Sequence, residues 1–244
     1  ESGNKLLALI DGRTIYTPLA SSIFWNLHSP LLEDVQQIEV ISGPGGTLYG
    51  PNAVNGVINI TSLDAQETIG TMARGTVGAD ERTAALRHGM ALGGGGAIRF
   101  YGNWHDRDGL PAGVGGARDD AWGGWQAGFR SDFVSDEDHF TLQGDVFDAD
   151  AETLEGDGAR GHNILARWSR TLSPDTSFQV QTYYDWFKRE AILTSDSLQT
   201  IDGEAQLNFN RGAHELVVGS GIPTTKDEFI NNLNAFQPNP SRRR

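Results

Sequence analysis

The chain of 244 residues contains no cysteine. This absence excludes a disulfide framework, a thiolate metal site and a thiol nucleophile. Basic residues are also scarce, with 19 Lys and Arg against 32 Asp and Glu and a formal charge of −13. Because clustered Lys and Arg are needed to neutralise phosphate, the balance argues against general nucleic-acid binding.

Long apolar runs are missing as well. No stretch of roughly 18 apolar residues occurs, so the sequence predicts no transmembrane helix. Strands of about 9–11 residues can still cross a bilayer, and each of them carries only a weak alternating signal. With 38% hydrophobic residues, the chain is too apolar for a disordered acidic protein.

Residues 1–66 contain short continuous apolar runs, at 6–10, 38–41 and 57–60. Such runs, separated by Gly and Pro, predict short strands buried on both faces. Residues 31–35 are expected to form a brief helical turn. This part is predicted to be a small α+β unit, and residues 67–244 a second domain.

From residue 67 onward, apolar and polar residues alternate with a period of two. In the stretch 177–189, Phe178, Val180 and Trp186 share one face, and Gln179 and Gln181 lie on the other. Alternation of this kind predicts strands. The predicted strands are 69–79, 82–92, 97–106, 121–133, 139–148, 161–172, 177–189, 203–211 and 214–222.

The connections between these strands differ in length in a regular way. From the third strand on, long and short connections alternate: 106–120, 135–138, 149–160, 173–176, 190–202 and 211–213. Long loops at one end and tight turns at the other are typical of outer-membrane barrels. The polar faces agree, because a dry sandwich core cannot satisfy Gln, Asn and Arg, whereas a wet or plugged lumen can.

One segment resembles a known family. Residues 38–60 read IEVISGPGGTLYGPNAVNGVINI, and LIDGR precedes them at 9–13. Over residues 6–62 the chain resembles the plug-domain signature of TonB-dependent outer-membrane receptors. The resemblance implies a partial α+β plug followed by an all-β, antiparallel transmembrane barrel, part of a plugged barrel of about twenty-two strands.

Length suggests that the chain is a fragment. Twenty-two strands at this spacing need about 440 residues. We therefore expect more than half of the barrel to lie outside the chain. The same holds for the N-terminal segment that contacts TonB in the family.

The resemblance implies an active transporter rather than an enzyme. Such a receptor, in the outer membrane of a Gram-negative bacterium, imports a scarce extracellular ligand with energy delivered by TonB and its inner-membrane complex. A ferric siderophore or similar iron complex is expected by family frequency, and cobalamin, haem and oligosaccharide remain open. The expected partners are TonB, a small-molecule ligand and outer-membrane lipid. Two rivals are a passive porin-type channel and a secreted soluble β-protein.

Residues 16–28, YTPLASSIFWNLH, link two plug strands and contain an unusual Phe-Trp pair for a loop. In the family this stretch helps to form the floor of the ligand site. The candidate substrate contacts are Tyr16, Phe24, Trp25, Asn26 and His28. The alternative is that Phe24 and Trp25 pack inside the plug.

The resemblance also implies a latch between plug and barrel. The family usually has Arg immediately before the Gly-Pro pair, where this chain has Ser42, and a Glu three positions earlier, here Glu39. In relatives the two tend to pair with charged barrel residues. Glu39 is therefore a candidate latch residue.

Other motifs carry little chemistry. The glycine spacing at 45–50 lacks the Lys and Ser or Thr of a phosphate loop. The six histidines show no metal-ligand spacing, and no nucleophile elbow occurs, so no catalytic residue, cofactor or metal site is predicted. An acidic stretch does not match an EF-hand, so a solvated loop is favoured over a Ca²⁺ site. It comprises Asp145, Asp148, Asp150, Glu152, Glu155 and Asp157.

Overall fold

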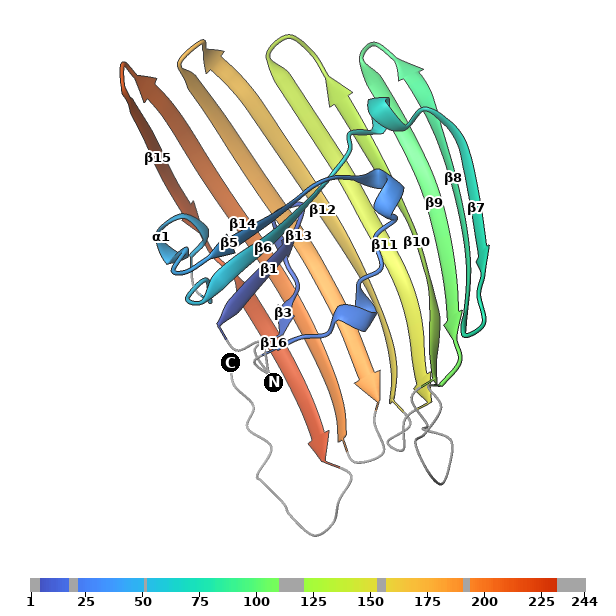
Figure 1. The fold of residues 1–244 in the computed structure, drawn as a ribbon. Coiled ribbons are helices and arrows are strands. Elements are labelled where there is room, and N and C mark those ends of the chain that lie inside the picture. The colour runs from blue at the N-terminus through green and yellow to red at the C-terminus, as the bar shows by residue number, and fades with distance from the viewer. Residues whose placement is uncertain are drawn as a thin grey trace. The chain divides into compact units, whose positions relative to one another are not determined.

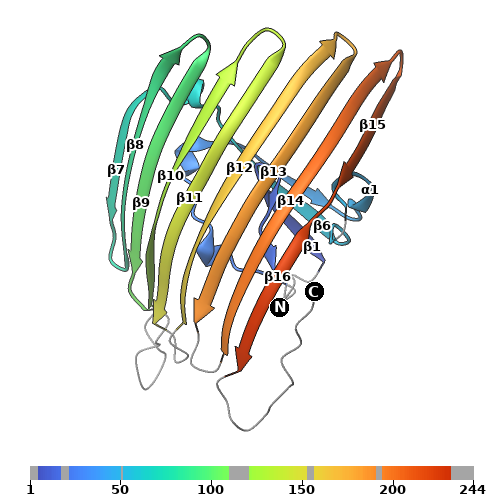
Figure 2. The same cartoon turned by 180° about the vertical axis from the view of Figure 1, so that it is seen from behind.

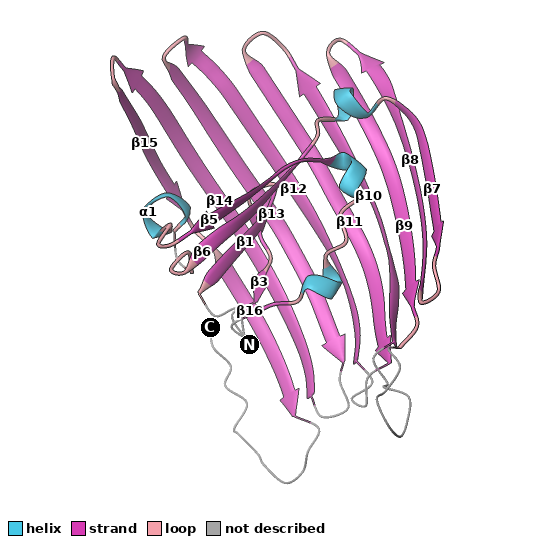
Figure 3. Ribbon diagram, in the orientation of Figure 1, coloured by secondary structure: helices cyan, strands magenta, loops and turns pink. Residues whose placement is uncertain are grey.

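The computed structural model describes residues 5–17, 22–50, 52–109, 121–152, 157–190 and 194–231. Strands dominate these residues, and the helices among them are short (Figure 3). None of the helices in these ranges is long and apolar enough to cross a membrane. The chain divides into two compact units, Glu1–Asp64 and Ala65–Arg244.

The first unit contains a four-stranded sheet in the order β2-β1-β6-β5. Its strands are β1 (Leu6–Ile10), β2 (Arg13–Thr14), β5 (Val35–Ser42) and β6 (Gly56–Ser62). A small hairpin, β3 (Tyr16–Thr17) with β4 (Ser22–Ile23), and three short helices complete it: η1 (Trp25–Leu27), η2 (Leu32–Asp34) and α1 (Gly46–Tyr49). The three predicted strands and the helical turn before β5 are confirmed.

Apolar side chains cover both faces of this sheet. Leu7 packs with Ala53 and Val57 in one cluster, and its neighbour Ala8 packs with Ile15 and Ile23 in another. Because successive strand residues point to opposite faces, the continuous apolar run 6–10 fills both clusters. The predicted burial on both faces is wrong for 38–41, since Ile38 and Val40 are exposed by 54% and 74%.

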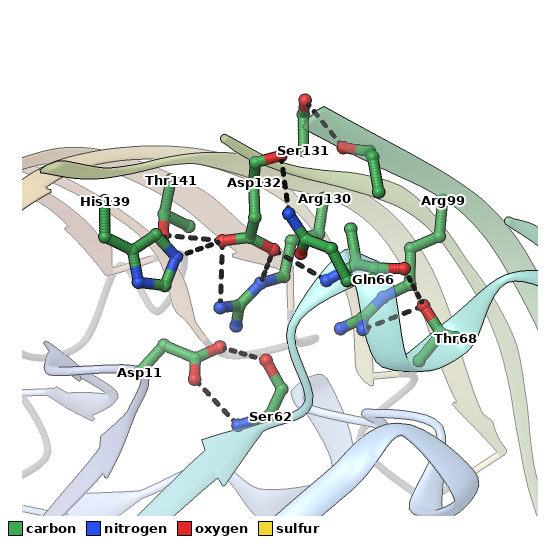
Figure 4. Close-up of polar contacts among 12 residues, drawn as sticks. Asp11, Ser62, Gln66, Thr68, Arg99, Arg130, Ser131, Asp132, His139 and Thr141 are labelled. Atoms are coloured by element: carbon green, nitrogen blue, oxygen red, sulfur yellow. Dashed lines mark hydrogen bonds and ion pairs between the residues drawn. The ribbon is translucent and has the colours of Figure 1, made fainter. Parts of the chain in front are cut away.

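The ends of β1 and β6 are joined by a buried carboxylate. Asp11 lies in a turn with a positive φ of 52°, and its two oxygens accept hydrogen bonds from the backbone N–H and the hydroxyl of Ser62, both at 2.8 Å. Figure 4 shows this pair. The Asp-Gly turn that was identified in the sequence is thereby fixed to the adjacent strand.

The second unit is a single antiparallel sheet (Figures 1 and 2). It follows a short helix, η3 (Ala65–Thr68). Its strands are β7 (Gly70–Val77), β8 (Glu81–Gly93), β9 (Gly96–Arg107), β10 (Ala121–Val134), β11 (Asp138–Glu152), β12 (Asp157–Ser173), β13 (Thr176–Glu190), β14 (Thr194–Arg211), β15 (His214–Gly221) and β16 (Thr224–Asn231). From β7 to β15, each strand pairs with the next along the chain. The predicted antiparallel all-β region and its nine strands are confirmed.

Two predicted long connections are wrong. β11 continues to Glu152 and β12 begins at Asp157, while β14 begins at Thr194 instead of residue 203. The added strand ends are largely polar, so they give little apolar alternation, yet their backbone groups still pair across the sheet. Arg189 and Asp196, for example, are cross-strand partners in the added part of β14.

The polar segment predicted after residue 222 is also wrong in part, because β16 continues the sheet there. β15 pairs with residues 204–211 of β14, and β16 pairs with residues 194–201 of the same strand. The break between them contains Pro223, which has no N–H to donate to the ladder. Just before it, the Ile222 N–H still donates to Gly203 O at 2.9 Å.

Candidate functional site

The two faces of the second unit's sheet differ in chemistry. We call the face that carries Phe100, Trp104, Trp125 and Phe140 the outer face, and these side chains are exposed by 44–51%. Trp104 and Trp125 are cross-strand partners, and the ring of Phe140 stacks on that of Trp168 with centroids 5.9 Å apart. The outer face is therefore an aromatic and aliphatic surface, as a lipid-facing band requires.

The opposite face, which we call the inner face, carries the buried polar residues of the sheet, together with the buried Leu165, Tyr183, Phe187 and Leu198. Its fully buried polar residues are Arg99, Gln126, Arg130, Asp132, Thr141, Gln181 and Asp196. Burial of polar groups costs free energy unless they are hydrogen-bonded. The Arg167 side chain accordingly donates to Gln181 Oε1 at 2.7 Å, and Arg189 donates to Asp196 at 3.0 Å.

A glycine makes room for one of these inner contacts. Tyr101 on β9 and Asp145 on β11 both lie opposite Gly128 on the intervening strand β10. The Tyr101 hydroxyl donates to Asp145, and Gln126 Nε2 donates to the Tyr101 oxygen at 3.0 Å. A Cβ at position 128 would lie 2.2 Å from Asp145 Oδ1. The contact across three strands therefore requires glycine there.

A second inner cluster centres on Asp132, which is fully buried (Figure 4). Its carboxylate accepts from Arg130 Nε at 2.7 Å and from the Thr141 hydroxyl at 2.7 Å, and His139 Nε2 lies 3.2 Å away. Strands β10 and β11 position these groups, since Asp132 and Thr141 are register partners. Sequence reasoning missed this cluster. Its only sequence signal is the i, i+2 spacing of Arg130 and Asp132 on the polar face.

The predicted ligand residues lie in the first unit, in β3 and around η1. Tyr16 is half-buried and packs against the cluster of Ala8, Ile15 and Ile23. Phe24 is half-buried and precedes η1, whereas Trp25 is 47% exposed. Residues 18–21 of the predicted segment fall outside the described residues. Asn26 is part of η1.

The turn of η1 determines which side chains face outward. The Leu27 N–H donates to Phe24 O at 3.0 Å and the His28 N–H donates to Trp25 O at 3.2 Å. This winding leaves Trp25 exposed and Leu27 buried. Burial and, secondarily, the positive charge of Arg13 lower the pKa of His28 to about 3, so His28 is neutral at physiological pH.

Glu39 is half-buried in β5 and is bonded within its own sheet. Its Oε2 accepts a hydrogen bond at 2.9 Å from Asn59 Nδ2, on the directly opposite residue of β6. Ser42, the residue in place of the family's Arg, is exposed at the end of the same strand.

The acidic stretch is not a single cluster. Strand alternation directs Asp145 to the inner face, where it bonds to Tyr101, and directs Asp148 and Asp150 to the outer face. Asp145 therefore cannot share one Ca²⁺ ion with Asp148 and Asp150, because ligands to one ion must converge. Glu155 falls outside the described residues.

Comparison with known proteins agrees with the order of the two units. Residues 1–57 match the family model of the TonB-dependent receptor plug domain. The chain is 32% identical over 110 residues to the vitamin B12 transporter BtuB of Vibrio vulnificus, a match covering 45% of this chain and 18% of that protein. It is 45% identical over 56 residues to the iron-regulated outer membrane virulence protein of Vibrio cholerae, covering 22% of this chain and 9% of that protein.

A solved structure extends the likeness to the sheet. The copper transporter OprC superposes with a TM-score of 0.77 at 17% identity, covering 92% of this chain and 38% of that one. At that identity the likeness shows the fold alone. The chain thus spans about two fifths of the length of this structure and less than a fifth of the length of the two sequence relatives. A plug-domain sequence followed by an antiparallel sheet with an apolar outer face is thus what this chain has in common with TonB-dependent outer-membrane receptors.

Proposed function

We propose that the chain belongs to a receptor that resides in the outer membrane and actively imports a scarce ligand into the periplasm. One observation carries this proposal. The residues that match a plug domain are followed by a sheet that exposes aromatic side chains on one face and buries polar side chains on the other. A passive porin-type channel gives no reason for the plug sequence. A secreted soluble β-protein gives no reason for the exposed aromatic outer face.

Energy for release of the ligand would come from TonB and its inner-membrane complex. The test is uptake by cells that express the full-length receptor, with and without TonB. Uptake that is lost without TonB supports the proposal, and uptake that continues supports a porin. A receptor and a porin should both sediment with the outer-membrane fraction and dissolve only in detergent. A soluble protein should need no detergent.

We propose a ferric siderophore or similar iron complex as the ligand. The support is the iron-regulated relative, which is 45% identical over the matched residues. The vitamin B12 transporter is matched over a longer stretch at 32% identity, so cobalamin is the first alternative, ahead of haem and oligosaccharide. Competition between radiolabelled ferric siderophores and cyanocobalamin, in a host without its own receptors, distinguishes these ligands.

Within the first unit, we propose Tyr16, Phe24, Trp25, Asn26 and His28 as the ligand-contacting group. Trp25 and His28 carry most of the argument. An exposed indole offers a large apolar and stacking surface, and a neutral imidazole can accept or donate a hydrogen bond. Tyr16 has the weakest support, because it packs on the core.

The test is alanine substitution at Trp25 and at His28 in the full-length receptor, with ligand affinity and uptake measured separately. Leu32→Ala is the matched control, because Leu32 is exposed by 66% on the neighbouring turn η2. We expect weaker affinity for the first two variants and no change for the control. Unchanged affinity in correctly folded Trp25→Ala and His28→Ala would contradict the assignment.

We also propose that Glu39 contributes a negative charge to the plug latch. Glu39→Gln keeps an oxygen for Asn59 but removes the charge, so it separates the latch from the local hydrogen bond. Weakened retention of the plug under mild denaturant is expected for this variant. Glu33→Gln, an exposed acid on η2, is the control.

A further inference from the structure

The first turn of the second unit, η3 (Ala65–Thr68), is bound to the inner face of the sheet. We call it the anchor turn. Ala65 is fully buried, and its N–H donates to Asp132 Oδ2 at 2.8 Å. The first N–H groups of a helical turn have no partner within the turn, so a carboxylate from β10 satisfies this one. Figure 4 shows the carboxylate of Asp132 and the polar side chains of the turn.

Further contacts hold the rest of the anchor turn. Gln66 Nε2 donates to Gly95 O at 2.8 Å and to Asp132 O at 3.2 Å. Thr68 is 1% exposed, and Arg99 Nη1 lies 3.5 Å from its hydroxyl oxygen. The anchor turn therefore contacts β9, the tight turn before β9, and β10.

The backbone of the anchor turn also lies directly against β8. A Cβ on Gly89 would be 2.2 Å from Thr68 O and 3.2 Å from the Ile69 Cα. Any side chain at position 89 would overlap the backbone of Thr68 and Ile69. Glycine there therefore permits the close approach of β8 to the anchor turn.

Contacts within the sheet also fix the carboxylate of Asp132. Arg130 contacts both carboxylate oxygens, at 2.7 and 3.1 Å, and Thr141 donates to Oδ1 at 2.7 Å. Charge-assisted hydrogen bonds are stronger than neutral ones. The acceptor for the Ala65 N–H is thus fixed by groups on two strands of the sheet.

The backbone hydrogen bonds of residues 63 and 65 go to different units. The Leu63 N–H donates to Asp34 O at 2.8 Å within the first unit. Two residues later, the Ala65 N–H donates to Asp132 within the second.

We propose that Asp132 is a positioning residue that keeps the anchor turn fixed to the sheet, so that an energised rearrangement of the first unit does not extend past Ala65 into the second unit. The inference rests on the proposed transport function. It predicts that the force applied to the first unit during transport is resisted at Ala65 and does not reach β7. Asp132 contacts no ligand in this account.

The first experiment measures the anchor turn directly and needs no transport. A spin label is placed at Glu67→Cys, an exposed position on the turn, in a full-length receptor whose other cysteines, if any, are replaced. In the otherwise native receptor we expect an immobilised spectrum that is unchanged when ligand and the TonB C-terminal domain are added. Asp132→Asn is expected to add a mobile component.

Asp196→Asn is the matched control. Asp196 is also a buried inner-face carboxylate, 1% exposed and bonded to Arg189 at 3.0 Å, but its contacts lie in β13 and β14. It should leave the label immobile. If Asp132→Asn does not fold, Ala65→Pro is the second variant, because it removes the donated N–H and keeps both Arg130 and Asp132 in the sequence.

The second experiment measures ligand binding and TonB-dependent uptake in the same variants. We expect unchanged surface binding and reduced uptake for Asp132→Asn or Ala65→Pro, and neither change for Asp196→Asn. The inference is overturned if the native label becomes mobile on energisation, or if the Asp132 and Ala65 variants leave it immobile. If instead the native receptor shows no TonB-dependent uptake, the proposed function fails while the label still reports on the anchor turn.

Discussion

The two units of this chain place polar and apolar groups in opposite ways. In the first unit, apolar side chains such as Leu7 and Val57 are buried between strands and loops. In the second, Arg130 and Asp132 are buried while Trp104 and Phe140 are exposed. Both arrangements are built from β-strands.

The difference shows that burial alone does not identify a hydrophobic core. A sheet whose outer face meets lipid gains no stability by hiding apolar side chains from its surroundings. Its polar inner groups must instead satisfy one another, so hydrogen bonds and ion pairs carry the specificity there. The predictions below test this inversion, beginning with the largest expected effect.

Arg130→Ala should destabilise the second unit by about 3–5 kcal/mol, because it leaves the buried Asp132 carboxylate without its cation. Denaturant unfolding of the full-length receptor in detergent measures this change. Arg82→Ala is the control, since Arg82 and Asp106 form an exposed pair at 2.8 Å, and exposed pairs contribute little to stability. An equal loss of unfolding free energy in the two variants would contradict the proposal that ion pairs on the inner face contribute more to stability than those on the outer face.

Val146→Arg should destabilise the membrane-inserted receptor by about 2–4 kcal/mol, the cost of a lipid-facing Arg near the bilayer midplane. Val146 lies on the outer face of β11 and is 46% exposed. Thr200→Arg, on the inner face opposite Asp185, should be tolerated. Unfolding in lipid bilayers compares the two, and the reverse order would mean that the faces are assigned the wrong way round.

Gly128→Ala should cost about 1–3 kcal/mol, since the added methyl group overlaps Asp145 and Tyr101. Gly203→Ala is matched to it, as a strand glycine with nothing within 4 Å of the added Cβ. Thermal unfolding in detergent measures both. A neutral result at position 128 would show that the contact from Tyr101 to Asp145 adjusts freely.

The first unit should lose stability as the pH falls below 6.5, because His28 has a pKa of about 3 when folded and 6.5 as a free side chain. Between these values the unfolded chain binds a proton that the folded chain does not, so unfolding becomes easier at lower pH. Allowing for the partial exposure of His28, the loss from pH 7 to pH 5.5 is about 1 kcal/mol.

Chemical denaturation of the receptor at the two pH values measures this dependence. His28→Gln should flatten it, while His214→Gln, at an exposed histidine in the second unit, should not. A stability that rises on acidification in the native protein would contradict the assignment of a neutral His28 in the folded state.

Much of the fold could be predicted from local pattern. The apolar run at 6–10 and the alternation at 177–189 each correspond to an observed strand. Local pattern does not predict the strand at Thr194–Asp202, where both faces are largely polar. It also does not predict β16, which Pro223 separates from β15. In both places pairing with a neighbouring strand, rather than side-chain polarity, maintains the extended backbone.

The site could be predicted less well. The Phe-Trp pair identified η1 as unusual, but only the winding of that turn shows that Trp25 is exposed while Leu27 is buried. In the Asp132 cluster, 67 residues of sequence separate Ala65 from Asp132, and 9 separate Asp132 from Thr141. No local rule brings such residues together, because the contact depends on strand register.

The sequence by itself therefore predicted an antiparallel sheet after residue 67, excluded thiol chemistry, and showed a segment at 38–60 that resembles the plug domain of TonB-dependent receptors. These follow from composition, periodicity and one continuous motif, which are properties of neighbours along the chain. Only the tertiary structure decided that Tyr101 reaches Asp145 over Gly128, that the acidic stretch is split between two faces, and that Asp132 holds the anchor turn. The reason is that register and close backbone approach are set by the whole sheet, so a residue's partner is fixed by the strands between them.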